Sequence, residues 1–116
     1  MNKPRILLVC YVGVNIGLGH LSRLLALADV LRKERKVQPE FLTFGDFIKK
    51  NELSNFNVHT FLLSDDFIDT IKNILETDNY DAVVLDLFPN HNIDNLGGLF
   101  IQLKRSNICL ISIDSL

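Results

Sequence analysis

A glycine-rich segment followed by a histidine and an arginine offers the most chemistry in this chain. Residues 17–28 read Gly-Leu-Gly-His-Leu-Ser-Arg-Leu-Leu-Ala-Leu-Ala, and Asn15 comes shortly before them. If a helix begins here, its first backbone N–H groups lack partners and its dipole is positive at this end. Such a helix start suits a phosphate, a carboxylate or a developing negative charge. An ordinary tight turn with solvated polar side chains is the alternative interpretation.

A buried strand and an amphipathic helix are expected to position these residues. The run Ile6-Leu7-Leu8-Val9-Cys10 predicts a fully buried strand, and apolar residues recur at helical spacing from Leu21 to Leu31. On that helix His20 lies on the flank of the apolar face and Arg23 lies well away from it. Neither side chain is therefore needed for the core.

The glycines match known nucleotide-binding motifs only in part. The dinucleotide fingerprint would place a third glycine where Gly17-x-Gly19-x-x is followed by Ser22. An acid is also expected about 20 residues further on, at a strand end, but Glu40 falls inside a predicted strand. No Gly-Lys-Ser/Thr sequence occurs, which excludes a Walker phosphate loop.

Strand and helix patterns alternate along the chain. Strands are expected over 5–11, 38–44, 57–63, 81–87 and 108–113, and helices over 19–35, 46–53, 65–77 and 92–105. This alternation predicts the α/β class: one Rossmann-like domain with a doubly wound, mostly parallel five-stranded sheet in the order 3-2-1-4-5. A chain of 116 residues can bury one core of ordinary size.

Polar residues are expected to gather where the parallel strands end, since ligands bind at that edge of such sheets. They are Asn15 to His20, Gly45-Asp46, Ser64 to Asp66, Asp86, Asn90-His91 and Asp114. Asp86 and Asp114 have the alternative role of turn or capping acids. His59 alternates with apolar neighbours in a strand and is interpreted as structural.

Composition restricts the partners. A formal net charge of -2 argues against nucleic acid or an anionic membrane as the main partner. The basic residues Arg32, Lys33, Arg35 and Lys36 suit the negative end of a helix dipole. Peripheral docking near an anionic membrane surface remains the alternative for this cluster.

The two cysteines indicate a reducing compartment. Cys10 and Cys109 both fall in predicted interior strands, where we expect buried thiols rather than a disulfide framework. Neither has the spacing of a metal site, and we expect a cytoplasmic protein without metal or cofactor. The apolar N-terminal run leads directly into the glycine turn and is not interpreted as a secretion signal.

Motifs in both halves of the chain resemble one enzyme family. The string Ile16-Gly17-x-Gly19-His20-x-x-Arg23-x-Leu25-x-Leu27-Ala28-x-x-Leu31 resembles the start of the N-terminal domain in sugar-nucleotide enzymes of the GT-B type. Residues 80–89, Tyr-Asp-Ala-Val-Val-Leu-Asp-Leu-Phe-Pro, look like the fourth strand of that domain, and residues 111–116 look like the fifth.

Two branches of the family are similar to this chain: predicted glycosyltransferases with a Gly-Leu-Gly-His opening and the UDP-sugar hydrolase of the pseudaminic acid pathway. The hydrolase tends to have a second acid where Ser115 stands, and Asp-His-Tyr where residues 86–89 read Asp-Leu-Phe-Pro. These differences favour the glycosyltransferase branch.

The resemblance implies an acceptor-side or catalytic domain that works with a nucleotide sugar, UDP-linked, and a sugar or lipid-linked acceptor. His20 would bind or deprotonate the acceptor hydroxyl, or act as the base toward water in the hydrolase, with Asp86 as a second catalytic residue. The substrate-binding residues would be Asn15, Gly17, Gly19, Arg23 and Asp114. A C-terminal domain, which this chain lacks, would supply most nucleotide contacts.

A non-catalytic domain that binds a small ligand or a partner at the same strand ends is the alternative from another class. For the half-enzyme interpretation we expect exposed apolar side chains on the fifth strand and the fourth predicted helix, where further elements would normally cover the sheet. Exposed patches of this kind mark interfaces, so self-association as a dimer is expected.

Overall fold

A sheet of five parallel strands organises the computed structural model, which describes residues 4–12, 19–34, 37–45, 56–61, 67–87 and 96–114. The strands are β1 (Arg5–Val12), β2 (Gln38–Gly45), β3 (Asn57–Phe61), β4 (Ala82–Leu87) and β5 (Cys109–Asp114). Their order is β3-β2-β1-β4-β5, and every pairing is parallel. The predicted doubly wound, Rossmann-like α/β fold is confirmed, including its strand order.

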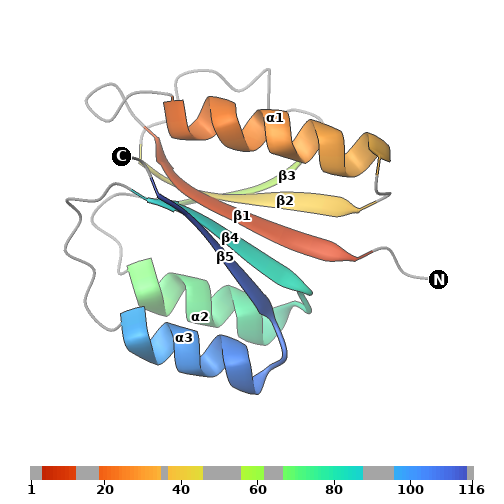
Figure 1. Cartoon of the computed structure of the whole chain (residues 1–116). Coiled ribbons are helices and arrows are strands. Elements are labelled where there is room, and N and C mark those ends of the chain that lie inside the picture. Colours follow the sequence, from red (N-terminus) through yellow and green to blue (C-terminus); the bar gives the residue numbers. More distant parts are fainter. Residues whose placement is uncertain are drawn as a thin grey trace.

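Helices cover both faces of the sheet. Figure 1 shows α1 (Gly19–Glu34) on one face and α2 (Phe67–Thr77) and α3 (Leu96–Arg105) on the other. These helices correspond to the predictions over 19–35, 65–77 and 92–105. The predicted helix over 46–53 lies outside the described residues, and so do residues 62–63, 65–66 and 92–95 of the neighbouring predictions.

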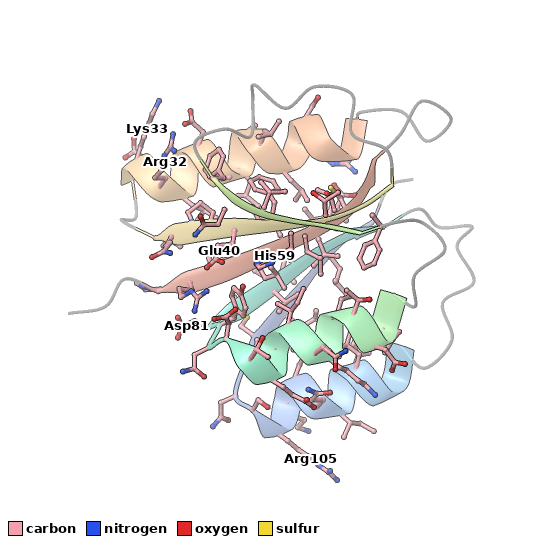
Figure 2. The ribbon with its side chains drawn as sticks, turned by 180° about the vertical axis from the view of Figure 1, so that it is seen from behind. Arg32, Lys33, Glu40, His59, Asp81 and Arg105 are labelled. Atoms are coloured by element: carbon pink, nitrogen blue, oxygen red, sulfur yellow. The ribbon has the colours of Figure 1, made fainter. Side chains whose placement is uncertain are left out.

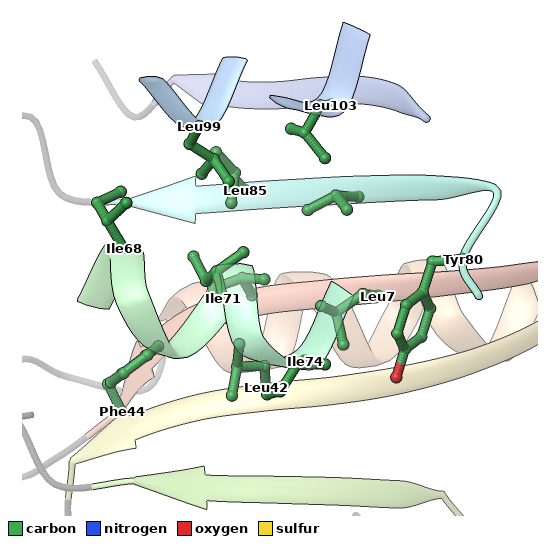
Figure 3. Close-up of a cluster of buried hydrophobic side chains, with 12 residues drawn as sticks. Leu7, Leu42, Phe44, Ile68, Ile71, Ile74, Tyr80, Leu85, Leu99 and Leu103 are labelled. Atoms are coloured by element: carbon green, nitrogen blue, oxygen red, sulfur yellow. The ribbon is translucent and has the colours of Figure 1, made fainter. Parts of the chain in front are cut away.

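Alternating strand residues build one apolar core on each face. Beneath α2 and α3 the core contains Leu7, Val9, Leu42, Phe44, Ile68, Ile71, Ile74, Tyr80, Val83, Leu85, Leu99 and Leu103, most of which Figure 3 labels. Beneath α1 it contains Leu8, Cys10, Leu24, Ala28, Phe41 and Val84. Because neighbouring strand residues point to opposite faces, strands buried on both sides read as continuous apolar runs.

The end of α3 is fixed by a left-handed residue. Asn107 has a φ of 56°, a conformation that asparagine tolerates better than most residues. The backbone N–H of Ile108 donates to the carbonyl of Leu103 at 2.9 Å, and that of Asn107 donates to Lys104 at 3.2 Å. These bonds close the helix and turn the chain directly into β5.

One buried carboxylate holds the amino ends of the strands together. Glu40 on β2 is only 3 % exposed, and its Oε2 accepts a 2.7 Å hydrogen bond from Nε of Arg5 on β1. Tyr80 donates its hydroxyl to Oε1 at 3.2 Å, and Nε2 of His59 lies 3.8 Å from the same oxygen (Figure 2). His59 thus contacts a core carboxylate at the amino ends, away from the strand ends that were expected to bind ligand.

The Arg5 side chain also lies 4.6 Å over the Tyr80 ring. Burial opposes its charged form, but the hydrogen bond and the charge of Glu40 outweigh that effect and raise the pKa of Arg5. Burial, together with the nearby Glu40 charge, raises the pKa of Tyr80. The phenol therefore stays protonated as a donor to Glu40 at physiological pH.

Removing the charge of Glu40 should weaken the fold measurably. In a Glu40→Gln variant Arg5 loses the nearer of its two ionic partners and keeps only the 3.7 Å contact with Asp78, so we expect a loss of about 2–3 kcal/mol in the free energy of unfolding. The control is Asp29→Asn, because Asp29 forms only exposed pairs with Arg32 and Lys33 and should change stability by less than about 0.5 kcal/mol. Urea unfolding of both variants checks this, and equal losses would contradict it.

Candidate functional site

The first turn of α1 lies at the carboxyl end of the sheet. The helix begins at Gly19, with six residues between it and the end of β1 at Val12, and its first turn contains no acidic side chain that would offset the positive end of the dipole. Asn15 and Gly17 lie outside the described residues, and so do the side chains of His20 and Asp114. The backbone of His20 occupies the second position of α1, and Asp114 is the last residue of β5.

A bidentate ion pair joins α1 to the central part of the sheet. Nε of Arg23 donates to Oδ2 of Asp86 at 2.9 Å, and Nη2 donates to Oδ1 at 2.7 Å. The Asp86 side chain is fully buried, whereas that of Arg23 is 46 % exposed. The hydrogen bond and the charge of Asp86 raise the pKa of Arg23, so this guanidinium is permanently charged.

This geometry gives the two residues different chemical roles. Both oxygens of Asp86 bind the guanidinium, and the carboxylate has no exposed surface through which to meet a substrate. The Arg23 side chain is 46 % exposed and belongs to the beginning of α1. Such an arrangement suits an anion or an electron-rich hydroxyl near Arg23, while Asp86 fixes the orientation of the guanidinium.

Cys10 and Thr43 lie in one row with Asp86 across the three neighbouring strands beneath α1. Cys10 on β1 is paired in register with Asp86 on one side and with Thr43 of β2 on the other. Burial, and then the Asp86 charge, raise the pKa of the Cys10 thiol to about 12, which makes it unreactive at neutral pH. The buried Oγ1 of Thr43 finds no hydrogen-bond partner in the part of the chain that the structure describes.

The second cysteine corrects the sequence analysis. Cys10 is buried as expected, but Cys109 is exposed, so the prediction that both are buried is wrong. Cys109 belongs to β5, which forms an edge of the sheet, and α1 packs mainly over β1, β2 and β4. An apolar pattern typical of an interior strand does not reveal whether a helix covers it.

The basic end of α1 is largely engaged within the chain. Arg32 lies 4.6 Å over the Phe56 ring and 3.3 Å from Asp29, and Lys33 lies 3.2 Å from Asp29 (Figure 2). Arg35 and Lys36 lie outside the described residues. These contacts favour the interpretation of Arg32 and Lys33 as structural charges at a helix end.

The described residues contain neither a metal-binding cluster nor a membrane-spanning helix. They contain no group of three or more His, Cys, Asp or Glu side chains that could hold a metal ion. They also contain no helix with the length and apolar character needed to cross a membrane. The expected cytoplasmic location stays a prediction.

The sequence placed Arg23 and Asp86 at the same edge of the sheet but did not pair them. The available signal was an outward arginine near the start of a helix, together with an acid at the end of the neighbouring strand. The Glu40 cluster was missed, although a charged residue inside an apolar strand requires a buried partner.

Comparison with protein-family models, curated proteins and solved structures found no match for this chain.

The Arg23–Asp86 pair should show a diagnostic asymmetry in stability. Arg23→Ala leaves the buried carboxylate without its guanidinium, so we expect clear destabilisation. The double variant Arg23→Ala/Asp86→Asn should be more stable than Arg23→Ala alone, because the buried negative charge is gone. Thermal unfolding at pH 7 measures both.

Arg32→Ala serves as the matched control, since its partner Asp29 is solvent-exposed and should not suffer from losing it. A double variant less stable than Arg23→Ala would show that the Asp86 carboxylate is held by other contacts.

Proposed function

We propose that this chain is the N-terminal, acceptor-side domain of a GT-B-type glycosyltransferase that works with a nucleotide-sugar donor. The observation that carries the proposal is the Arg23–Asp86 ion pair. It links residues 63 positions apart that belong to the two segments on which the family resemblance rests. The pair lies beneath the start of α1, at the edge of a parallel sheet where ligands bind.

The first turn of α1 and Arg23 would together supply positive potential for a substrate. Helix N–H groups act as fixed donors, and the charged guanidinium adds a directional hydrogen-bonding group. Asp86 would serve catalysis by holding Arg23 in one orientation. This role reconciles its predicted importance with its complete burial.

His20 would supply the proton transfer. Its backbone position in the first turn puts it one helical turn from Arg23, and residues three apart share one side of a helix. Imidazole has a pKa near neutrality, which suits a base that removes the proton of an acceptor hydroxyl during sugar transfer. The donor nucleotide would be held mainly by a second domain.

Loss of the proposed base should reduce turnover without unfolding the domain. In an enzyme that contains this domain, we expect His20→Ala to lower the rate of sugar transfer by about 10²–10⁴-fold. His59→Gln is the matched control, because His59 lies against Glu40 at the opposite end of the sheet and should leave the rate nearly unchanged. Near-normal turnover in His20→Ala would make His20 a residue of the turn only.

Ligand titration of the chain itself gives an independent check. If it is an acceptor-side domain, we expect weak or undetectable binding of free UDP by calorimetry. Acceptor-class sugars at millimolar concentration should shift backbone amide signals of residues 19–23 in NMR spectra, and these shifts should be smaller in Arg23→Ala. Binding of UDP with micromolar affinity would indicate a self-sufficient nucleotide-binding domain and contradict the proposal.

A further inference from the structure

The outer edge of β5 carries an unusual share of exposed apolar surface. Of the four large apolar side chains exposed in the described residues, Phe100, Ile101 and Ile111 belong to α3 and β5, and the fourth is Val30 on α1. β5 ends the sheet, so within the described part of the chain no strand pairs with its outer side. It contains neither lysine nor proline, the residues that commonly protect an edge strand from pairing.

The exposed side chains lie on both sides of this open edge. Cys109, Ile111 and Ile113 share the α1 face of β5, where Ile111 is 47 % exposed. On the other face, Leu99 of α3 points into the core, and a Cβ placed on Gly98 would lie 3.7 Å from Lys72 of α2. Successive residues of a helix are rotated by about 100°, so Gly98 and Phe100 lie on opposite sides of Leu99. Gly98 faces α2, and Phe100 therefore lies on the side of α3 away from α2, beside β5.

We propose that a second copy of this chain docks on the outer edge of β5, with the two β5 strands antiparallel about a twofold axis at Ile111. This pairing places Ile111 opposite its own counterpart and Cys109 opposite Ile113 of the second copy. The α1 face of the new strand pair then carries only Cys109, Ile111 and Ile113 from each copy over this stretch. A closed twofold dimer satisfies both open edges at once.

The same arrangement brings the two α3 helices together. An axis perpendicular to the sheet keeps both copies' α3 on one face, so the Phe100 flanks approach each other across the axis. Apolar contacts would therefore form on both faces of the joined sheet. The opposite edge strand, β3, offers no comparable surface, since its exposed described side chains are Asn57 and Thr60.

Charge also favours the antiparallel orientation. Lys104 and Arg105 end α3 beside the amino end of β5, and Asp114 ends β5 at its carboxyl end. Arg105 points away from the sheet in Figure 2, and no ion pair joins Lys104 or Arg105 to another described residue. Antiparallel pairing brings the acidic end of one strand to the basic end of the other, whereas parallel pairing would bring like charges together. A net charge of only -2 per chain adds little repulsion.

Analytical ultracentrifugation of the whole chain tests the surface. We expect the wild type to sediment as a dimer that dissociates on dilution, and Ile111→Lys to be a folded monomer, because lysine on an edge strand opposes pairing. Val30→Lys is the matched control: Val30 is 55 % exposed on α1 and its replacement should leave the dimer intact. A monomeric wild type, or a dimer that survives Ile111→Lys, would overturn the proposal.

Cross-linking tests the register independently of that variant's folding. In a Cys109→Ser background, Ile111→Cys places two thiols on opposed residues whose Cα atoms should lie about 4.5–5.5 Å apart, within reach of a disulfide. We expect mild oxidation to produce a covalent dimer from this variant. Val30→Cys in the same background should remain monomeric under denaturing electrophoresis. Absence of the Ile111→Cys cross-link would contradict the antiparallel pairing.

Discussion

A charged carboxylate buried within a sheet needs an opposite charge nearby. For Asp86 this charge comes from α1, so the position of α1 on the sheet is linked to the burial of Asp86. The side chain is fully buried in β4, and its guanidinium partner comes from the second turn of α1. Removing Arg23 would take away the charge that offsets the desolvation of Asp86. Removing the Asp86 charge would take away the group that orients the Arg23 side chain. The ion pair therefore joins the start of α1 to β4, beside the apolar packing of Leu24 and Ala28 against the sheet.

The sheet contains a second buried carboxylate, and the contrast between the two explains why only one end is a functional candidate. Glu40 lies on the α2 and α3 face near the amino ends, with Arg5, Tyr80 and His59 around it. Its arginine is 27 % exposed and also contacts the Tyr80 ring. At Asp86 the arginine is 46 % exposed and comes from α1. The Glu40 cluster lies near the amino ends of the strands, whereas the Arg23–Asp86 pair places a partly exposed charged group near the carboxyl ends, where ligands bind in sheets of this kind.

The sequence predicted the strand order and most element positions because apolar runs and helical spacing are local properties. It predicted that Arg23 avoids the core, which its exposure confirms. It could not pair Arg23 with Asp86, because that contact depends on how α1 crosses the sheet. It also placed Cys109 in the interior, although the covering of an edge strand depends on which strands the helices cross. The exposed apolar side chains expected on the fifth strand and the preceding helix were confirmed at Ile111, Phe100 and Ile101.

The open edge and the candidate site are neighbours but would not compete. Asp86 lies in β4, and β5 separates that strand from the edge of the sheet. In an antiparallel pairing of two β5 strands, the carboxyl ends of the two sheets point in opposite directions. Each copy would then present its own α1 start at a different end of the joined sheet. Dimerisation would therefore cover the apolar edge and leave both Arg23 side chains exposed. The dimer and the proposed function are tested by separate measurements.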